Sequence, residues 1–556
     1  MLKRFFILVI ISYLWEGLHS EIIVKTKLGK IRGIIQKSRK GSDFYSFRGV
    51  RYAEPPIGEN RFRDSTPVKP WEGVMDATKD GFLCPQERVD PSLISEDCLI
   101  LNIYTKNLQG TLPVMFYLHG GFFSIGGSHS ELFWNQRYLM DKEIILVTMN
   151  YRVGPFGFLY TETEDATGNF GTKDQVIALQ WVRDNIQNFG GDPNQVTLWG
   201  HSSGSMMVTL HMVSPMSQGL FHKAIAMSGS ATSHISPRSL NSTQNLARNF
   251  QCPPGDMKLL VQCLRNVPFQ NLAKISYDFL DWFVVVEKEF GQNIFLPDNP
   301  STLFAQGKFA RVPVLAGRTK DEFEPDAFIF LIVQYKGTNN IQELNEDFYR
   351  KAPYMLGYDP ALTSVSDTLK RVYLKNRPIT ACNLDAYGRL YSDANMVHGI
   401  HRFVELVRKY TTVFYYQQDF QGRYSWYYDA DGKPYGIYHA DDLLYFFVKK
   451  SKAPMFKETD PENLMVETAT TLWTTFATNP WTANIWWTPS NRFCGRVLYI
   501  NRRSHMGLRL RSIRKRMKLW DNLFPVPNHI FTLLLFEASH FILEVHGLVR
   551  FFGFLQ

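Results

Sequence analysis

The 556-residue sequence lacks internal repeats and low-complexity tracts. Solenoid proteins and disordered scaffolds depend on such features, so both classes are excluded. Between residues 21 and 527 there is also no linker rich in proline, glycine or serine. We therefore expect a single folded domain over this range rather than several independent ones.

Cysteine is scarce, with six residues in the chain, and a number this small suits a protein of an oxidising compartment. Two pairs lie close in sequence, and each pair could close a small loop. The pairs are Cys84 with Cys98 and Cys252 with Cys263, whereas Cys382 and Cys494 follow no evident pairing rule.

Residues 1–20 have the features of a secretory signal peptide. A positive start precedes an apolar stretch over residues 5–14, which is too short to span a bilayer, and Ser20 offers a small residue for cleavage. A single N-glycosylation sequon begins at Asn241. The sequence therefore predicts a secreted, extracellular glycoprotein.

The positive charge is local. Eight of the basic residues lie between residues 502 and 518, and removing them from the net charge of +9 leaves +1. Nucleic-acid binding by the whole chain is therefore not expected. We interpret the segment as a solvated helix face, with binding to an anionic surface as the alternative.

The C-terminal tail, residues 528–556, is apolar but interrupted by Glu537, His540, Glu544 and Arg550. These polar residues argue against a stable membrane span. The sequence assigns the tail no role.

Several apolar runs have strand length and no alternation with polar residues. Such runs are typical of strands buried on both faces of a helix-covered sheet. Residues 172–189 carry apolar residues on one face and a capping-box pattern at Thr172 and Gln175, which predicts a helix. We expect strands at 114–118, 144–148, 196–199, 224–227, 312–316, 413–416 and 497–500. The predicted class is α/β, with a large, mostly parallel central sheet and helices on both faces.

The pentapeptide Gly200-His201-Ser202-Ser203-Gly204 lies between a predicted strand and a helix-compatible run. That context is required for a nucleophile elbow, in which a strained turn projects the serine hydroxyl into a cleft. A side chain at Gly200 or Gly204 would crowd the neighbouring strand or helix. Because the same pattern also occurs in ordinary turns, Ser202 becomes a candidate nucleophile only if partners exist.

Hydrolysis of an ester through serine requires N–H donors for the oxyanion, a base and an orienting carboxylate. The glycine turn His119-Gly120-Gly121-Phe122 directly follows a predicted strand, and the Ser203 N–H would add a further donor. Among 14 histidines, His439 is favoured as the base over His119 and His201, because this fold places its base late in the chain. For the carboxylate, Asp321, Glu322 and Glu324 compete, and spacing does not choose between them.

A set of short motifs in a fixed order resembles the type-B carboxylesterase/cholinesterase family of α/β-hydrolases over roughly residues 22–525. The motifs are Glu54–Gly58, Ser95–Leu99, His119–Phe123, Asn150–Arg152, Gly157–Leu159, Phe189–Pro193 and the elbow at Ser202. The resemblance implies a triad of Ser202, Glu322 and His439, with oxyanion donors from Gly121, Phe122 and Ser203. It also implies the disulfides Cys84–Cys98 and Cys252–Cys263, and no cofactor or metal ion.

The sequence departs from the family pattern at the elbow and near Cys84. His201 stands where the family usually has Glu, and Ser203 where it usually has Ala. The loop from Cys84 to Cys98 contains no Trp, whereas cholinesterases carry a choline-stacking Trp there, so a choline esterase is not expected. The family's third disulfide has no matching cysteines near residues 398 and 518.

The predicted function is a secreted serine carboxylesterase, and an aromatic content of 14% suits a pocket for apolar esters. One alternative is a juvenile-hormone or pheromone esterase, because the sequence looks most like arthropod members of the family. Juvenile-hormone esterases, however, generally carry Gln where His201 stands. The other alternative is a non-catalytic adhesion protein of the same family, although such relatives usually lack the serine or its partners.

Overall fold

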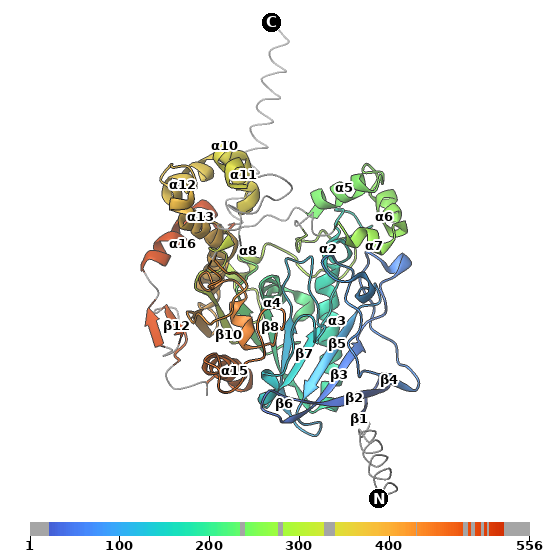
Figure 1. Ribbon diagram of the computed structural model, residues 1–556. Helices are drawn as coiled ribbons and strands as arrows, with labels where there is room; N and C mark the ends of the chain where they lie inside the picture. The colour runs from blue at the N-terminus through green and yellow to red at the C-terminus, as the bar shows by residue number, and fades with distance from the viewer. Residues whose placement is uncertain are drawn as a thin grey trace, which may run out of the picture.

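The computed structural model describes most of the chain between Ile22 and Pro527 (Figure 1). The expected signal peptide, the apolar tail and Cys494 lie outside the described residues. These residues are 22–233, 239–275, 282–326, 340–429, 431–481, 487–490, 495–501, 505–508 and 511–527.

One sheet runs through the protein and, within the described residues, has thirteen strands. Its order is β1-β2-β3-β5-β7-β6-β8-β9-β10-β11-β12-β13, and β4 pairs with β2. Pairing is antiparallel from β1 to β7 through β5, parallel from β7 through β6 to β12, and antiparallel between β12 and β13. The strands are β1 Ile22–Lys25, β2 Lys30–Lys37, β3 Asp43–Arg51, β4 Val74–Asp76, β5 Ile100–Thr105, β6 Leu112–Leu118, β7 Ile145–Met149, β8 Gly191–His201, β9 Lys223–Met227, β10 Val314–Thr319, β11 Val413–Gln418, β12 Arg496–Ile500 and β13 His505–Leu508. The predicted mostly parallel sheet is confirmed.

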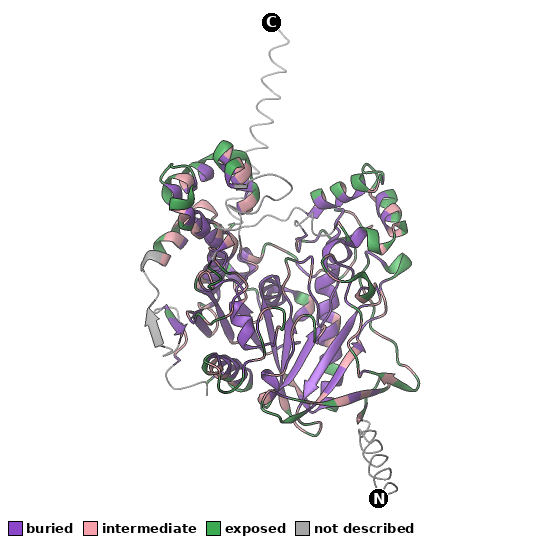
Figure 2. Ribbon diagram, viewed as in Figure 1, coloured by how far each residue is buried: buried purple, intermediate pink, exposed green. Residues whose placement is uncertain are grey.

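The centre of the sheet is buried on both faces, as the purple strands in Figure 2 show. On β6, Phe116 and Leu118 belong to one apolar cluster, whereas Met115 and Tyr117 belong to a second cluster on the opposite face. Because neighbouring residues of a strand point to opposite faces, an uninterrupted apolar run is needed for a strand covered on both sides.

Helices cover both of these faces. Those that contribute to the first cluster include α3 Phe170–Asn185, α4 Ser203–Val213 and α14 His398–Val407, and α15 Asn463–Thr478 contributes to the second. Smaller elements include α2 Gly154–Phe158, α5 Ser239–Asn249, α6 Met257–Asn266, α7 Phe269–Ala273, α8 Pro300–Ala305 and the 3₁₀ turn η8 Asp441–Tyr445. The predicted α/β class, with helices on both faces, is confirmed.

A third apolar cluster lies among the outer helices. It joins α10 Asn340–Glu346, α11 Phe348–Leu356, α12 Thr363–Leu374 and α13 Leu384–Ser392 to α16 Arg511–Leu523. These helices and α5–α7 form two groups at the top of Figure 1, with β1 and β2 at the bottom. Trp520 and Met517 of α16 are fully buried in this cluster.

The long helix after β7 begins earlier than the sequence indicates. Its N-cap is Asn169, which has φ of 62° and makes no side-chain capping bond, and the helix starts at Phe170. The Thr172 hydroxyl donates instead to the Asn169 carbonyl oxygen at 2.8 Å. The capping box predicted at Thr172 and Gln175 is therefore wrong, because the backbone turns into the helix two residues before Thr172.

Both predicted disulfides are present, joining Cys84 to Cys98 and Cys252 to Cys263. Cys382 is exposed and carries a free thiol. Within the described residues, no helix is both long enough and apolar enough to cross a membrane.

Candidate active site

Ser202 lies where β8 ends and α4 begins. Its backbone φ of 59° and ψ of −128° form a combination that residues with side chains rarely adopt. The Ser202 N–H donates to the Met227 carbonyl oxygen of β9 at 2.9 Å, which fixes the turn against the next strand. The strand, strained turn and helix expected of an elbow are all present.

The glycines of the elbow are required by close backbone contacts. A Cβ atom on Gly200 would lie 2.4 Å from the Gly204 carbonyl oxygen, and one on Gly204 would lie 2.2 Å from the Leu118 carbonyl oxygen. Both distances are far below van der Waals contact. The predicted crowding at these two positions is confirmed.

The turn after β6 lies against the elbow. A Cβ atom on Gly120 would lie 2.9 Å from the Ser202 Cβ, and Gly121 and Phe122 have φ of +124° and 55°. Within the described part of the chain, the backbone N–H groups of Gly121, Phe122 and Ser203 donate to no acceptor. The three N–H groups are therefore unused donors on the two segments that meet at Ser202.

Glu322 follows β10 and contacts His439 through both side chain and main chain. The Oε2 atom of Glu322 lies 2.6 Å from Nδ1 of His439, and the His439 N–H donates to the Glu322 carbonyl oxygen at 3.0 Å. The other carboxylate oxygen of Glu322 accepts from the Ser228 hydroxyl at 2.6 Å and from the Thr319 N–H at 2.9 Å. These bonds stabilise a fully buried carboxylate and fix its orientation.

The competing acids are engaged elsewhere. The Asp321 carboxylate accepts from the Ile437 N–H at 2.8 Å, and Glu324 lies 3.7 Å from Arg389. Burial raises the pKa of Glu324 to about 7. Of the three acids that the sequence left open, the structure places Glu322 against His439.

His201 packs on the ring of His439. Its ring centroid lies 4.6 Å from that of His439, and His201 directly precedes Ser202. Among the described residues, no hydrogen bond joins the Ser202 hydroxyl to the His439 ring. Hydrogen bonds of this kind are often long without substrate and tighten when it binds.

His119, the other histidine near the elbow, is held by its own turn. Its Nδ1 lies 2.8 Å from the Gly120 carbonyl oxygen, and its ring stacks on Tyr151 at 4.1 Å. Burial lowers the pKa of His119 to about 4. The ring therefore supports the glycine turn and is not free to act as a base.

Backbone strain gathers around the site. Phe122, Ser202, Ser228 and Glu322 have φ values of 55°, 59°, 52° and 50°. Left-handed backbone is uncommon for residues other than glycine and tends to occur at functional sites, where the surrounding fold holds it.

Phe122 and Phe323 form an aromatic wall beside His439. Phe122 is 43% exposed and stacks on Phe323 with centroids 6.1 Å apart, and Phe323 lies 4.4 Å from the His439 ring. The wall presents apolar surface next to the unused N–H donors.

Sequence reasoning missed two groups at the site. Ser228, at the end of β9, orients Glu322, and Asp442 lies 3.9 Å from His201. Neither has a local sequence signal, because each meets its partner only through the pairing of distant segments.

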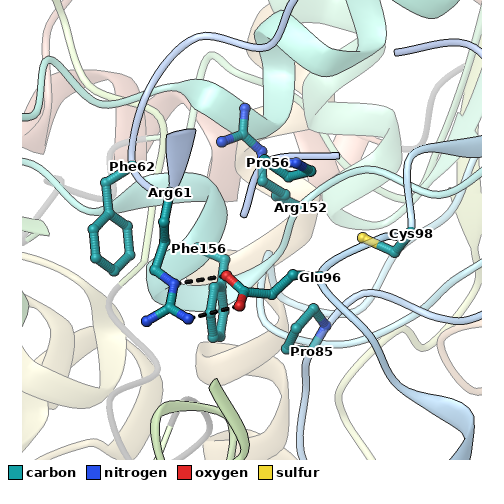
Figure 3. A pocket seen from close by; sticks show the side chains of 8 residues that line it. All are labelled: Pro56, Arg61, Phe62, Pro85, Glu96, Cys98, Arg152 and Phe156. Carbon is teal, nitrogen blue, oxygen red and sulfur yellow. Dashed lines mark hydrogen bonds and ion pairs between the residues drawn. The ribbon is translucent and has the colours of Figure 1, made fainter. Parts of the chain in front are cut away.

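The acidic motif at residues 95–99 forms a structural ion pair through Glu96. Figure 3 shows Arg61 pointing at Glu96 in a small pocket beside Cys98 and Phe156. Both contacts between the guanidinium and the carboxylate are 2.6 Å, and Arg61 also donates to three carbonyl oxygens at the end of α6 and just beyond it. This pocket is therefore occupied by groups that join segments of the fold, and it does not contain the triad.

The predicted sequon and the predicted basic helix face both lie at the surface. Asn241 of the sequon is exposed near the start of α5. On the basic helix α16, Arg514, Lys515 and Lys518 are exposed, and Arg516 pairs with Asp393 at 2.8 Å. Across the described ranges, no cluster of three or more His, Cys, Asp or Glu side chains is arranged to hold a metal ion.

Several known proteins are similar to this chain in sequence. A family model described as the carboxylesterase family matches residues 20–519. Juvenile hormone esterase of Tribolium castaneum is 35% identical over 501 residues, covering 82% of this chain and 83% of that protein. Esterase E4 of Myzus persicae is 33% identical over 485 residues, covering 82% and 85%.

A solved structure shares the fold. It is juvenile hormone esterase from Manduca sexta with OTFP covalently attached, at a TM-score of 0.82 and 26% identity. The match covers 91% of this chain and all of that one. The sheet and its covering helices are those of the α/β-hydrolase fold.

Proposed function

Since the chain belongs to the carboxylesterase family and is a carboxylic ester hydrolase, we propose that it acts through an acyl-enzyme on Ser202. The observation that carries the proposal is the 2.6 Å contact between Glu322 and His439, beside a strained serine elbow. Glu322 and His439 are 117 residues apart in the chain, and the His439 ring packs on His201, the residue before Ser202, which supports the proposal.

In the proposed reaction, His439 accepts the Ser202 hydroxyl proton through Nε2 as the serine oxygen attacks the ester carbonyl carbon. Glu322 stabilises the imidazolium that forms, because its carboxylate faces Nδ1. His439 then gives the same proton to the alkoxide as the carbon–oxygen bond to the alcohol breaks. A water molecule repeats the sequence and releases the acid, which restores the serine.

The oxyanion receives the N–H groups of Gly121, Phe122 and Ser203. These groups are bonded to nothing else among the described residues, so no existing bond opposes their donation. A donor of this type contributes about 3 kcal/mol to the transition state. Because the donors are backbone groups on glycine-packed turns, they need little reorganisation during the reaction.

We propose an apolar ester as substrate, because the exposed ring of Phe122 and the adjacent Phe323 line the approach to the donors. A narrower candidate is a juvenile-hormone or pheromone ester, and the relatives named juvenile hormone esterase support the first of these. Competition assays with aliphatic, aromatic and terpenoid esters separate the two. A preference for the terpenoid ester favours the hormone, and equal competition favours a general carboxylesterase.

We also propose secretion. Two disulfides and an exposed sequon asparagine suit an oxidising compartment, and residues 1–20 have the pattern of a leader. Expression in a secretory cell line should place the mature protein in the medium, with a glycan on Asn241. Retention of the uncleaved chain in the cell would contradict this.

Turnover of p-nitrophenyl acetate tests the catalytic proposal. Ser202→Ala should lower turnover by at least about a thousandfold and abolish covalent labelling by an organophosphate. Ser203→Ala is the matched control, because it removes a hydroxyl but keeps the backbone N–H, and it should retain most of the turnover. A folded wild-type protein without turnover would instead favour the non-catalytic adhesion interpretation.

A further inference from the structure

His201 and Asp442 form a buried pair directly behind the nucleophile. His201 ends β8, and Asp442 lies in η8, three residues after His439. The Nε2 atom of His201 lies 3.9 Å from Oδ1 of Asp442, and both side chains are 4% exposed. The His201 ring also packs on the His439 ring, with centroids 4.6 Å apart.

Three polar atoms of this pair make no hydrogen bond of ordinary length within the part of the chain that the structure describes. These atoms are Nε2 of His201 and the two carboxylate oxygens of Asp442. Buried polar atoms are normally paired, and a buried carboxylate without a donor is strongly disfavoured. Each group is thus an available partner of the other, and the buried Tyr416 hydroxyl is a further available donor to Asp442.

The His201–Asp442 pair has three possible charge states, and two of them are costly. With a neutral His201 ring and an ionised Asp442, the pair would place a second buried negative charge beside the Glu322 carboxylate. With a proton on both, a cation would lie against the His439 ring, where positive charge must form during the reaction. One shared proton avoids both costs and leaves the pair with no net charge.

The groups around the pair also favour a state without net charge. Asp442 faces Glu322 after β10, Asp441 in its own turn, and the phenols of Tyr117 on β6 and Tyr416 on β11. Burial, then the charge of Glu322, raises the pKa of Asp442 well above its ordinary value. Burial, then the charge of His439, lowers the pKa of His201 well below its ordinary value. Both directions place the proton on the carboxyl side of the pair.

We propose that His201 and Asp442 share one proton and, as a net-neutral pair, act as positioning residues that hold the His439 ring against the elbow. The proposal rests on the proposed role of His439 as the base. The family usually has Glu in place of His201, and a carboxyl there would face Asp442 and make the pair anionic. In this chain the elbow histidine removes that negative charge and retains a ring that packs on the base.

The pH dependence of kcat/KM tests the charge of the pair. Asp442→Asn also gives a net-neutral pair, so its acid limb should fall within about 0.3 pH units of the wild-type limb. His201→Glu gives two facing carboxyl groups, of which at least one ionises, and should move the acid limb upward by about one pH unit. The negative charge favours the protonated form of the neighbouring base.

Two outcomes overturn the neutral pair. A downward shift of about one pH unit in Asp442→Asn would mean that the native pair carries negative charge. An unmoved limb in His201→Glu would mean that the pair does not act on the base.

The split between kcat and KM tests the positioning role. Asp442→Leu removes the partner of the His201 ring, and kcat should fall about tenfold with KM nearly unchanged. Asp442→Asn should restore most of that loss, because its amide can still bond to Nε2. Equal kcat values for the two variants overturn the positioning role. If the Leu variant does not fold, the pH profile of the near-isosteric Asn variant decides.

Failure of this inference is distinguishable from failure of the proposed function. Organophosphate labelling of Ser202 and turnover by the wild-type protein test the triad alone. Wild-type turnover together with either an unmoved limb in His201→Glu or a downward shift in Asp442→Asn rejects the neutral pair and leaves the triad in place.

Discussion

Glu322 and His439 are joined twice, through the 2.6 Å contact of Oε2 with Nδ1 and through the bond from the His439 N–H to the Glu322 carbonyl oxygen. The main-chain bond brings the two loops together independently of the side chains. Substitution of the Glu322 carboxylate should therefore change the chemistry more than the fold.

We expect Glu322→Gln to lower kcat by roughly a thousandfold or more, because an amide can favour the wrong tautomer of the base. Asp321→Asn is the matched control, since it alters a neighbouring carboxylate that accepts from the Ile437 N–H and lies 4.0 Å from the Lys320 ammonium. Its kcat should fall less than about tenfold. Steady-state kinetics on p-nitrophenyl acetate measure both, and a larger loss in Asp321→Asn would assign the acid differently.

Ser228→Ala should lower kcat by about tenfold with little change in KM. Its hydroxyl donates to Oε1 of Glu322 at 2.6 Å, and loss of a bond to a buried carboxylate costs about 1.5–3 kcal/mol. Ser205→Ala is the control, because Ser205 is equally buried but bonds to the Gly229 carbonyl oxygen. If both variants keep the wild-type kcat, Ser228 does not orient the acid.

Glu96→Gln should destabilise the fold by roughly 3–5 kcal/mol while leaving the Ser202 reactivity of the folded fraction intact. The change leaves the Arg61 guanidinium buried without its charged partner. Asp97→Asn is the adjacent control, since the Arg51–Asp97 pair is 39% and 40% exposed and should contribute less than about 1 kcal/mol. Urea unfolding compares the two, and equal losses would contradict the structural role of the buried pair.

Glu324 should contribute a loss of folding stability as pH rises from about 4 to about 7. Burial raises its pKa from 4.5 to about 7, so the folded state binds more protons than the unfolded state in this window. The penalty is absent below the unfolded value and complete above the folded one. In Glu324→Gln the loss of stability between pH 5 and pH 8 should be smaller by about 2 kcal/mol. Urea unfolding at pH 5 and pH 8 measures this loss in the wild-type protein and in Glu324→Gln. Equal losses in the two proteins would show that Glu324 ionises freely in the fold.

The sequence predicted features that depend on neighbouring residues. The apolar runs identified the central strands because strands buried on both faces need continuous apolar residues. The two glycines around Ser202 marked the elbow because backbone contacts of 2.4 Å and 2.2 Å exclude side chains there. The predicted start of α3 was wrong, because the chain enters the helix through left-handed backbone at Asn169 without a capping side chain.

Features that depend on distant segments were not predicted from the residues. Spacing left Asp321, Glu322 and Glu324 equal, and only the family resemblance favoured Glu322. Asp442 and His201 are 241 residues apart in the chain, and they meet because η8 lies beside the end of β8. The third cluster, with Trp520 and Met517 at its centre, arises from helices at residues 340–392 and 511–523 and has no local signal of its own.

The backbone contacts among Gly120, Gly204 and Ser202 make the hydroxyl and the donor turns one rigid unit. The outer helices α10–α13 rest on a separate apolar cluster. Substitutions among these outer helices should therefore leave the backbone around Ser202 unchanged. The outer helices can thus differ between related proteins while the backbone packing around Ser202 stays the same.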